Sequence, residues 1–204
     1  MLRARIAVLV SGGGTNLQAL IDAEKSGALH SGSISLVVSN KADAYALERA
    51  RAAGIPAVTI LRADCGGQQG FEEKLIALLE REKIDLVILA GFMSILSENF
   101  TRRFENRILN VHPSLIPSFC GKGFYGLHVH EAALAYGVKV TGATVHFVNE
   151  IPDGGRIILQ KAVDILPGDT PESLQKRVME QAEWKILPAA AEMVSAEIIK
   201  GKTE

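Results

Sequence analysis

The chain has 204 residues, of which 48% are hydrophobic and 22% charged, and its formal net charge is −1. These values predict one globular domain over residues 1–204 and argue against nucleic acid or an anionic membrane as partner, because both are bound by clustered positive charge. The sequence holds no apolar run of membrane-spanning length, and a strand pattern starts at Arg5, so we expect a cytoplasmic protein without a signal peptide.

Strand and helix patterns alternate through the first half of the chain. Apolar, β-branched runs separated by segments with helical spacing of leucine and alanine favour an open, mostly parallel α/β sheet. Residues 62–70 are polar and rich in glycine and are expected to form a loop. We expect strands at 5–10, 34–39, 57–60, 85–90 and 107–111, and helices at 15–26, 44–53, 71–83 and 97–104.

The pattern changes after Val111. A helix is expected at 129–136, and two strands at 139–148 and 156–164 are expected to pair as an antiparallel ribbon across the turn NEIPDGG. A long final helix from about residue 171 is expected to kink at Pro188. Glycines in the loop 119–130 suggest a mobile flap, and the chain as a whole predicts a Rossmann-like sheet with a mixed second half.

The segment VLVSGGGTNLQALID (8–22) places three glycines between a strand and a helix, a turn that suits an anion. A dinucleotide fingerprint needs a small residue where Leu17 stands and an acidic residue after the second strand, where the chain has SNK. A nucleoside triphosphate loop needs a lysine that the turn lacks. Two interpretations remain equally open: a single-phosphate site on the amides of 13–16, or a tight turn whose Thr15 caps the helix.

The segment ILNVHPSLIP places Asn110 and His112 two residues apart at the end of a strand, so both side chains leave the same face. An amide and an imidazole side by side can donate hydrogen bonds to an oxyanion. Asp153 in the turn NEIPDGG is the candidate partner of His112. A carboxylate there is expected to raise the pKa of His112 and keep it protonated near neutral pH.

The other histidines and the two cysteines are given structural roles. His30, His128, His130 and His146 are expected at the surface or in packing, and no His, Cys or Asp cluster with metal-ligand spacing is present in the sequence. Cys65 and Cys120 are expected to be free thiols. The sequence therefore predicts no metal site.

Five segments resemble phosphoribosylglycinamide formyltransferase, the folate-dependent enzyme family of purine synthesis: SGGGTNLQAL, SNKADAYALERA, LAGFMSIL, ILNVHPSLIPSF and GATVHFVNEIPDGGRIILQKAV. The catalytic pattern is also similar to the formyl-transfer domains of methionyl-tRNA formyltransferase and of formyltetrahydrofolate dehydrogenase and hydrolase. The Thr15-Asn16 turn and the chain length favour the first family.

The resemblance implies two substrates, glycinamide ribonucleotide and 10-formyltetrahydrofolate, and a division into a phosphate-binding half (about 1–111) and a folate and catalytic half (about 112–204). It implies that Asn110 and protonated His112 stabilise the oxyanion while Asp153 keeps His112 charged and helps to move a proton. It places Glu183 on the ribonucleotide and the phosphate on Gly13, Gly14, Thr15, Asn16 and Leu17. Its implied folate contacts are Gln68, Met93, Ser94, Ile95, Leu96, Asn110, Asn149, Glu150, Ile151, Pro152 and Asp153.

Three positions depart from the common pattern of that family. Ser94 and Gln68 stand where many or some members carry arginine, and Trp184 replaces a frequent histidine. These departures bear on folate affinity and leave the chemistry in place. Two other functions remain open: hydrolysis of 10-formyltetrahydrofolate, or a binding module for phosphate or folate without catalysis.

Overall fold

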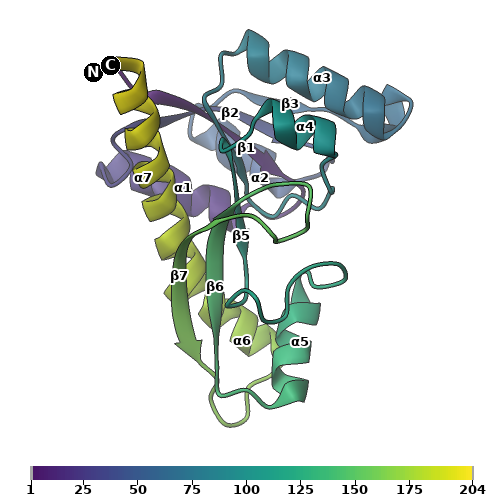
Figure 1. Ribbon diagram of the computed structural model, residues 1–204, viewed down its shortest axis with the longest axis vertical. Coiled ribbons are helices and arrows are strands. Elements are labelled where there is room, and N and C mark those ends of the chain that lie inside the picture. Colours follow the sequence, from purple (N-terminus) through teal and green to yellow (C-terminus); the bar gives the residue numbers. More distant parts are fainter. Residues whose placement is uncertain (1, 204) are drawn as a thin grey trace.

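The computed structural model describes residues 2–203, within which seven strands form one sheet in the order β3-β2-β1-β4-β5-β6-β7 (Figure 1). The first five strands run parallel, and β6 is antiparallel to both β5 and β7. This confirms the predicted mostly parallel α/β sheet and its antiparallel ribbon. The strands are β1 (Ala4–Val10), β2 (Gly32–Ser39), β3 (Ala57–Thr59), β4 (Leu86–Leu89), β5 (Ile108–His112), β6 (Val140–Phe147) and β7 (Ile157–Asp164).

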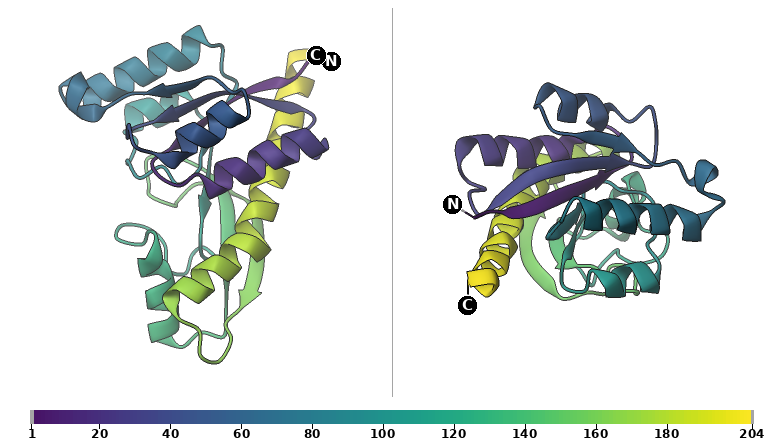
Figure 2. Two further views of the ribbon diagram at one scale, coloured as in Figure 1. Left: turned by 180° about the vertical axis from the view of Figure 1, so that it is seen from behind. Right: turned by 90° about the horizontal axis from the view of Figure 1, so that it is seen from above.

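Helices cover both faces of the sheet, as Figure 2 shows from above. On one face, Leu17, Leu20 and other apolar residues of α1 join a core with α2, α6 and α7. On the other face, Phe71 and Phe100 bring α3 and α4 against the same strands. None of the helices within residues 2–203 has the length and apolar composition needed to cross a membrane. The helices are α1 (Thr15–Ser26), α2 (Tyr45–Ala52), α3 (Gln68–Arg81), α4 (Glu98–Arg103), α5 (Leu127–Tyr136), α6 (Pro171–Val178) and α7 (Trp184–Thr203).

The predicted loop at 62–70 is partly wrong. A 3₁₀ turn occupies Arg62–Cys65, and α3 begins at Gln68, three residues earlier than expected. Gly70, which suggested a loop, lies inside the first turn of α3. A Cβ atom at this position would stand 2.0 Å from the carbonyl oxygen of Cys65, so the glycine permits close packing of helix against turn.

The expected single C-terminal helix is also corrected. It consists of α6, a π-helical turn at Met179–Glu183 and α7, and Pro188 lies inside α7. Proline cannot donate to the carbonyl four residues before it, here that of Trp184, and the wide turn lies directly before that residue. Glu183, the last residue of this π turn, is 6% exposed.

The order in which strands are added to the sheet reverses between β1 and β4. Strands β2 and β3 lie on one side of β1, whereas β4 and β5 lie on its other side. Ligands of such sheets bind at the carboxyl ends of the strands beside this point. The glycine turn follows β1, the segment 91–97 follows β4, and Asn110 and His112 lie in β5. The topology therefore gathers the predicted site residues at one edge of the sheet.

Candidate active site

The three predicted catalytic residues lie together. β5 extends one residue further than expected and includes His112, so Asn110 and His112 share one face of a regular strand. Asp153 has φ 56°, a left-handed conformation in the turn between β6 and β7. That turn carries its carboxylate to His112, where Oδ2 lies 3.5 Å from the imidazole Nδ1.

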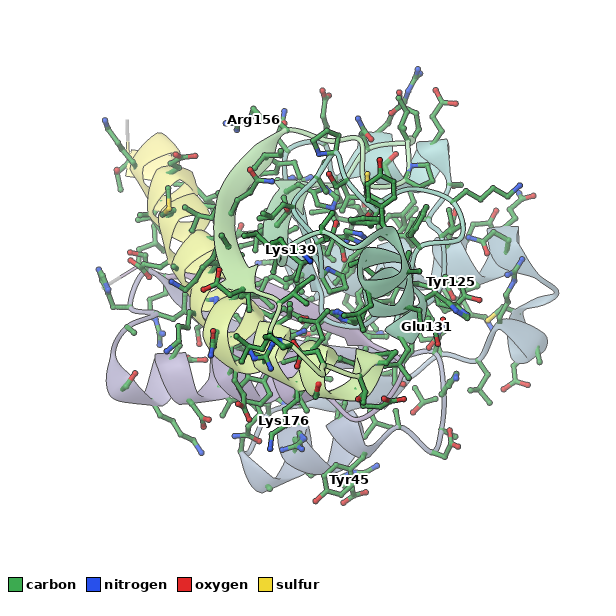
Figure 3. The ribbon with its side chains drawn as sticks, turned by 90° about the horizontal axis from the view of Figure 1, so that it is seen from below. Tyr45, Tyr125, Glu131, Lys139, Arg156 and Lys176 are labelled. Atoms are coloured by element: carbon green, nitrogen blue, oxygen red, sulfur yellow. The ribbon has the colours of Figure 1, made fainter. Side chains whose placement is uncertain are left out.

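The loop before α5 reaches the same two residues. The His112 Nε2–H donates to the carbonyl oxygen of Phe119 at 2.8 Å, and the backbone N–H of Gly121 donates to Asp153 Oδ2 at 2.8 Å. Phe119 packs edge-to-face against Tyr136 of α5. In Figure 3, Tyr125 lies beside α5. The predicted flap is thus in direct contact with His112 and Asp153.

His146 is a site residue that the sequence interpretation missed. In the antiparallel pairing of β5 with β6, it stands directly opposite Asn110. Its Nδ1–H donates to the carbonyl of Phe147 at 2.7 Å, which leaves Nε2 as the acceptor for Asn110 Nδ2 at 3.2 Å. Nε2 is also 3.5 Å from Asp153 Oδ1. His146 therefore orients the Asn110 amide and lies next to the Asp153 carboxylate.

The pKa of His112 differs from the expectation. Burial lowers the pKa of His112 below its ordinary value, and this outweighs the raising effects of Asp153 and of the Phe119 carbonyl. The expected effect of Asp153 is present but does not dominate. Burial raises the pKa of Asp153, yet His146, His112 and the Gly121 amide together bring it below the usual range. At neutral pH the site holds a neutral His112 beside an ionised Asp153.

The glycine turn ends at Gly14, the N-cap of α1, with φ 72°. A Cβ atom here would lie 2.6 Å from the Cβ of Ala46, so glycine serves both the backbone conformation and the approach of α2. Thr15 does not cap α1, because Gly14 is the N-cap and no side chain bonds the first-turn amides; the Thr15 hydroxyl donates instead to the sulfur of Met179 at 3.9 Å. The first-turn amides of α1 therefore stay available to an anion. Arg49 of α2 donates to the Gly13 carbonyl at 2.8 Å.

Glu183 lies against this turn. Its Oε2 accepts a 2.7 Å hydrogen bond from Asn16 Nδ2. Burial raises the pKa of Glu183, and the bond from Asn16 only partly opposes this effect. Asn16 was expected to assist a phosphate, but its N–H₂ group is engaged by Glu183. Leu17 is fully buried, so only its backbone faces the turn. A cavity of ≈ 840 Å³ extends from Thr15 along the groove between α1 and α7.

Two loops border Asn110 and carry the residues predicted to bind folate. In the segment after β4, Met93 and Ile95 are 55% and 72% exposed, while Leu96 is buried. In the turn after β6, Ile151 is exposed with Glu150 and Pro152, and Asn149 accepts a hydrogen bond from the Ile151 amide. Ser94 accepts from Asn40 at 2.8 Å, and Gln68 donates to the Ile95 carbonyl at 2.9 Å.

The remaining predicted residues lie in several environments. His30 and His128 are exposed and pair with glutamates. His130 is fully buried in α5, and burial with the nearby His112 lowers its pKa to about 4. Cys65 and Cys120 are free thiols. Within residues 2–203, no three His, Cys, Asp or Glu side chains are grouped so that they could hold a metal ion.

Comparison with known proteins shows which family the chain belongs to. Residues 4–191 match the formyl transferase family. The chain belongs to this family. It is 45% identical to phosphoribosylglycinamide formyltransferase of Haemophilus influenzae, over 90% of this chain and 84% of that protein. Within the family of formyl transferases it therefore groups with the phosphoribosylglycinamide formyltransferases, as the sequence resemblance predicted.

The match to solved structures covers the same region. Glycinamide ribonucleotide transformylase 1 from Symbiobacterium toebii has a TM-score of 0.89 and 44% identity, over 96% of this chain and 89% of that one. The human trifunctional purine biosynthetic protein adenosine-3 is 47% identical over 95% of this formyl transferase chain. The chain spans only 18% of the length of that human protein.

Proposed function

We propose that this chain transfers the formyl group of 10-formyltetrahydrofolate to the amine of glycinamide ribonucleotide. The observation that carries the proposal is the grouping of Asn110, His112 and Asp153 beside a glycine turn with available helix amides. Family membership and the names of the full-length relatives support it. The proposal treats residues 1–204 as one catalytic unit, because the glycine turn and Asp153 both lie at the sheet edge where the parallel strands have their carboxyl ends.

The chain's part in the reaction follows from its hydrogen-bond donors. One N–H of the Asn110 amide is bonded to His146, and the other N–H can donate to an oxygen that gains negative charge. The Nε2–H of His112 already donates to a carbonyl, that of Phe119. A formyl oxygen would replace Phe119 as the acceptor. As the amine nitrogen bonds to the formyl carbon and the bond from that carbon to the folate nitrogen breaks, the ionised Asp153 takes the proton lost by the amine and relays it to the departing folate nitrogen.

The ribonucleotide would be held at the glycine turn before α1. The amides of Gly13 to Leu17 and the Thr15 hydroxyl would bind its phosphate, with the N-terminal charge of α1 favouring the anion. Glu183 would accept hydrogen bonds from the ribose or the glycinamide. Two fixed ends would place the amine in line with the formyl carbon, and such positioning contributes a large part of the rate of two-substrate reactions.

The folate loops fit a flat, amphipathic heterocycle. Met93, Ile95 and Ile151 expose apolar surface on the loops that follow β4 and β6, the two strands paired with Asn110, and the buried Asn40 Oδ1 has no hydrogen-bond partner among the described residues. Such a mixture of apolar walls and unsatisfied polar atoms is typical of small-molecule sites. The residues that bind folate would be those predicted from the sequence, and Gln68 would contribute through its hydrogen bond to the Ile95 carbonyl. When bound, 10-formyltetrahydrofolate supplies an activated formyl group.

One assay tests the proposal. Purified protein is incubated with 10-formyltetrahydrofolate, with and without glycinamide ribonucleotide, and both tetrahydrofolate and formylated ribonucleotide are measured. We expect tetrahydrofolate release only when the ribonucleotide is present, in a one-to-one ratio with the formylated product. Release without the amine would indicate a hydrolase instead. Binding of either ligand without turnover would indicate a non-catalytic module.

Glu183→Gln tests the ribonucleotide contact. Replacing one carboxyl oxygen of Glu183 with an N–H₂ donor is expected to raise the KM for glycinamide ribonucleotide about tenfold, the effect of one lost hydrogen bond. Although the substitution weakens substrate binding, it is expected to raise the stability of the folded protein at high pH. Because the folded pKa of Glu183 is raised, the protein loses stability as pH rises from the ordinary value of 4.5 through the folded pKa. The variant escapes this loss, so its Tm should exceed that of the wild type at pH 8 and match it at pH 4.

Glu192→Gln is the matched control on α7, since Glu192 bonds the backbone of Ser31 and lies outside the proposed contacts. It should leave the KM for the ribonucleotide unchanged. An unchanged KM in Glu183→Gln as well would remove Glu183 from the substrate site.

A further inference from the structure

The segment Gly91–Ser97 lies outside the helices and strands, although it presents Met93 and Ile95 to solvent. Irregular backbone with exposed apolar side chains is costly to order, so a site built on it needs separate anchors. The sheet provides two of them. Ser11, after β1, accepts a 2.9 Å hydrogen bond from the Met93 amide, and Asn40, after β2, donates to the Ser94 hydroxyl.

The third anchor is Glu72 of α3, a carboxylate that is only 4% exposed. It accepts hydrogen bonds from the Ser97 amide at 2.8 Å, from the Ser97 hydroxyl and from Gln68 Nε2. The same Gln68 nitrogen donates to the Ile95 carbonyl at 2.9 Å. Glu72 therefore holds Ser97 directly and Ile95 through Gln68.

The partners of this carboxylate are unusual for a buried acid. Buried Glu side chains are normally paired with a cation, yet among residues 2–203 no Lys, Arg or His lies within ion-pair distance of Glu72. Its hydrogen bonds go to the segment 91–97 or to the glutamine that holds it. A buried carboxyl group whose hydrogen bonds all go to one irregular segment or to its supporting glutamine indicates that this group secures the conformation of the segment.

We propose that Glu72 is a positioning residue for the folate-binding segment: it fixes the backbone of 93–97, directly at Ser97 and through Gln68 at Ile95. This inference rests on the proposed function. It changes the role of Gln68, which was expected to touch folate and here supports the Ile95 carbonyl. A segment fixed before binding loses less conformational entropy when the ligand arrives, so the contribution of Glu72 falls on folate affinity rather than on the chemical step.

The test is Glu72→Gln, which keeps the size of the side chain but replaces one acceptor oxygen with a donor. That donor would face the N–H groups of Ser97 or Gln68. We expect the KM for 10-formyltetrahydrofolate to rise about tenfold, the effect of one lost hydrogen bond. The kcat and the KM for glycinamide ribonucleotide should stay unchanged. Calorimetric binding of tetrahydrofolate should weaken by the same factor, and amides of 93–97 should exchange hydrogen faster.

Glu73→Gln is the matched control, because Glu73 is the exposed neighbour on α3 and bonds only Gln69. If Glu72→Gln binds tetrahydrofolate as tightly as the wild type, the inference is wrong. It is equally wrong if kcat and both KM values change together, since this would show a general structural role. Should Glu72→Gln not fold, Gln68→Ala removes the bond to Ile95 together with one of the bonds to Glu72 and should still raise the folate KM, with Gln69→Ala as its control.

The experiments distinguish failure of the proposed function from failure of the positioning role of Glu72. A wild-type protein that neither binds tetrahydrofolate nor transfers formyl would refute that function. A wild-type enzyme that is active, with Glu72 and Gln68 variants of equal folate affinity, would refute only the positioning role.

Discussion

Replacing His112 with alanine is expected to lower kcat by about 10²–10³, the typical effect of removing one donor to a developing oxyanion. His112 is almost fully buried, and its Nε2–H is held by the Phe119 carbonyl while Nδ1 faces Asp153. The alanine variant loses this donor, and Asn110 is left to stabilise the negative charge alone. Steady-state kinetics with both substrates measures the loss.

Binding of the ribonucleotide should survive in the same variant. The proposed phosphate site is built from the amides of 13–17, and Glu183 belongs to the turn before α7, so neither depends on His112. Calorimetry with glycinamide ribonucleotide should therefore give an affinity close to that of the wild type. His128→Ala is the control, because His128 is an exposed histidine of α5 that bonds Glu131. A kcat in His112→Ala near that of the wild type would refute the assignment.

The elements that local patterns specify were predicted well. Leucine spacing placed α1 at the residues where it is found, and the β-branched runs located each strand to within a few residues. Asn110 and His112 were recognised because two residues at the end of one strand share a face whatever the remaining chain does. The turn residue Asp153 could be proposed because it stands between two segments with strong strand patterns.

The parts that local patterns missed are set by distant contacts. His146 looked like a packing residue, and only the register between β5 and β6 places it opposite Asn110. The lowered pKa of His112 depends on how deeply the site is buried, which the spacing of Asn110, His112 and Asp153 does not reveal. Glu72 belongs to no recognisable sequence motif, because its partner Ser97 lies 25 positions away in the chain. Such pairs follow from the tertiary arrangement and carry no short-range pattern.

Replacing Asp153 with asparagine is expected to move the titration of His112 to lower pH. Burial already lowers this pKa, and Asp153 is the strongest group that opposes burial. Without the negative charge, burial and His146 act with less opposition, so the proton leaves His112 at a lower pH than in the wild type. The limb of the kcat/KM profile that reports His112 should shift in the same direction, and NMR of the His112 ring should show the shift directly.

The same substitution should lower kcat by about 10², the lower range for loss of a general acid–base group. Asparagine can still accept from the Gly121 amide, so the loop contact survives while the charge is lost. This separates the electrostatic role of Asp153 from its structural one. Asp164→Asn, on the exposed part of β7, is the control and should leave both the profile and kcat unchanged. If the profile of Asp153→Asn coincides with that of the wild type, Asp153 does not tune His112, and its carboxylate serves only to hold Gly121 and the loop before α5.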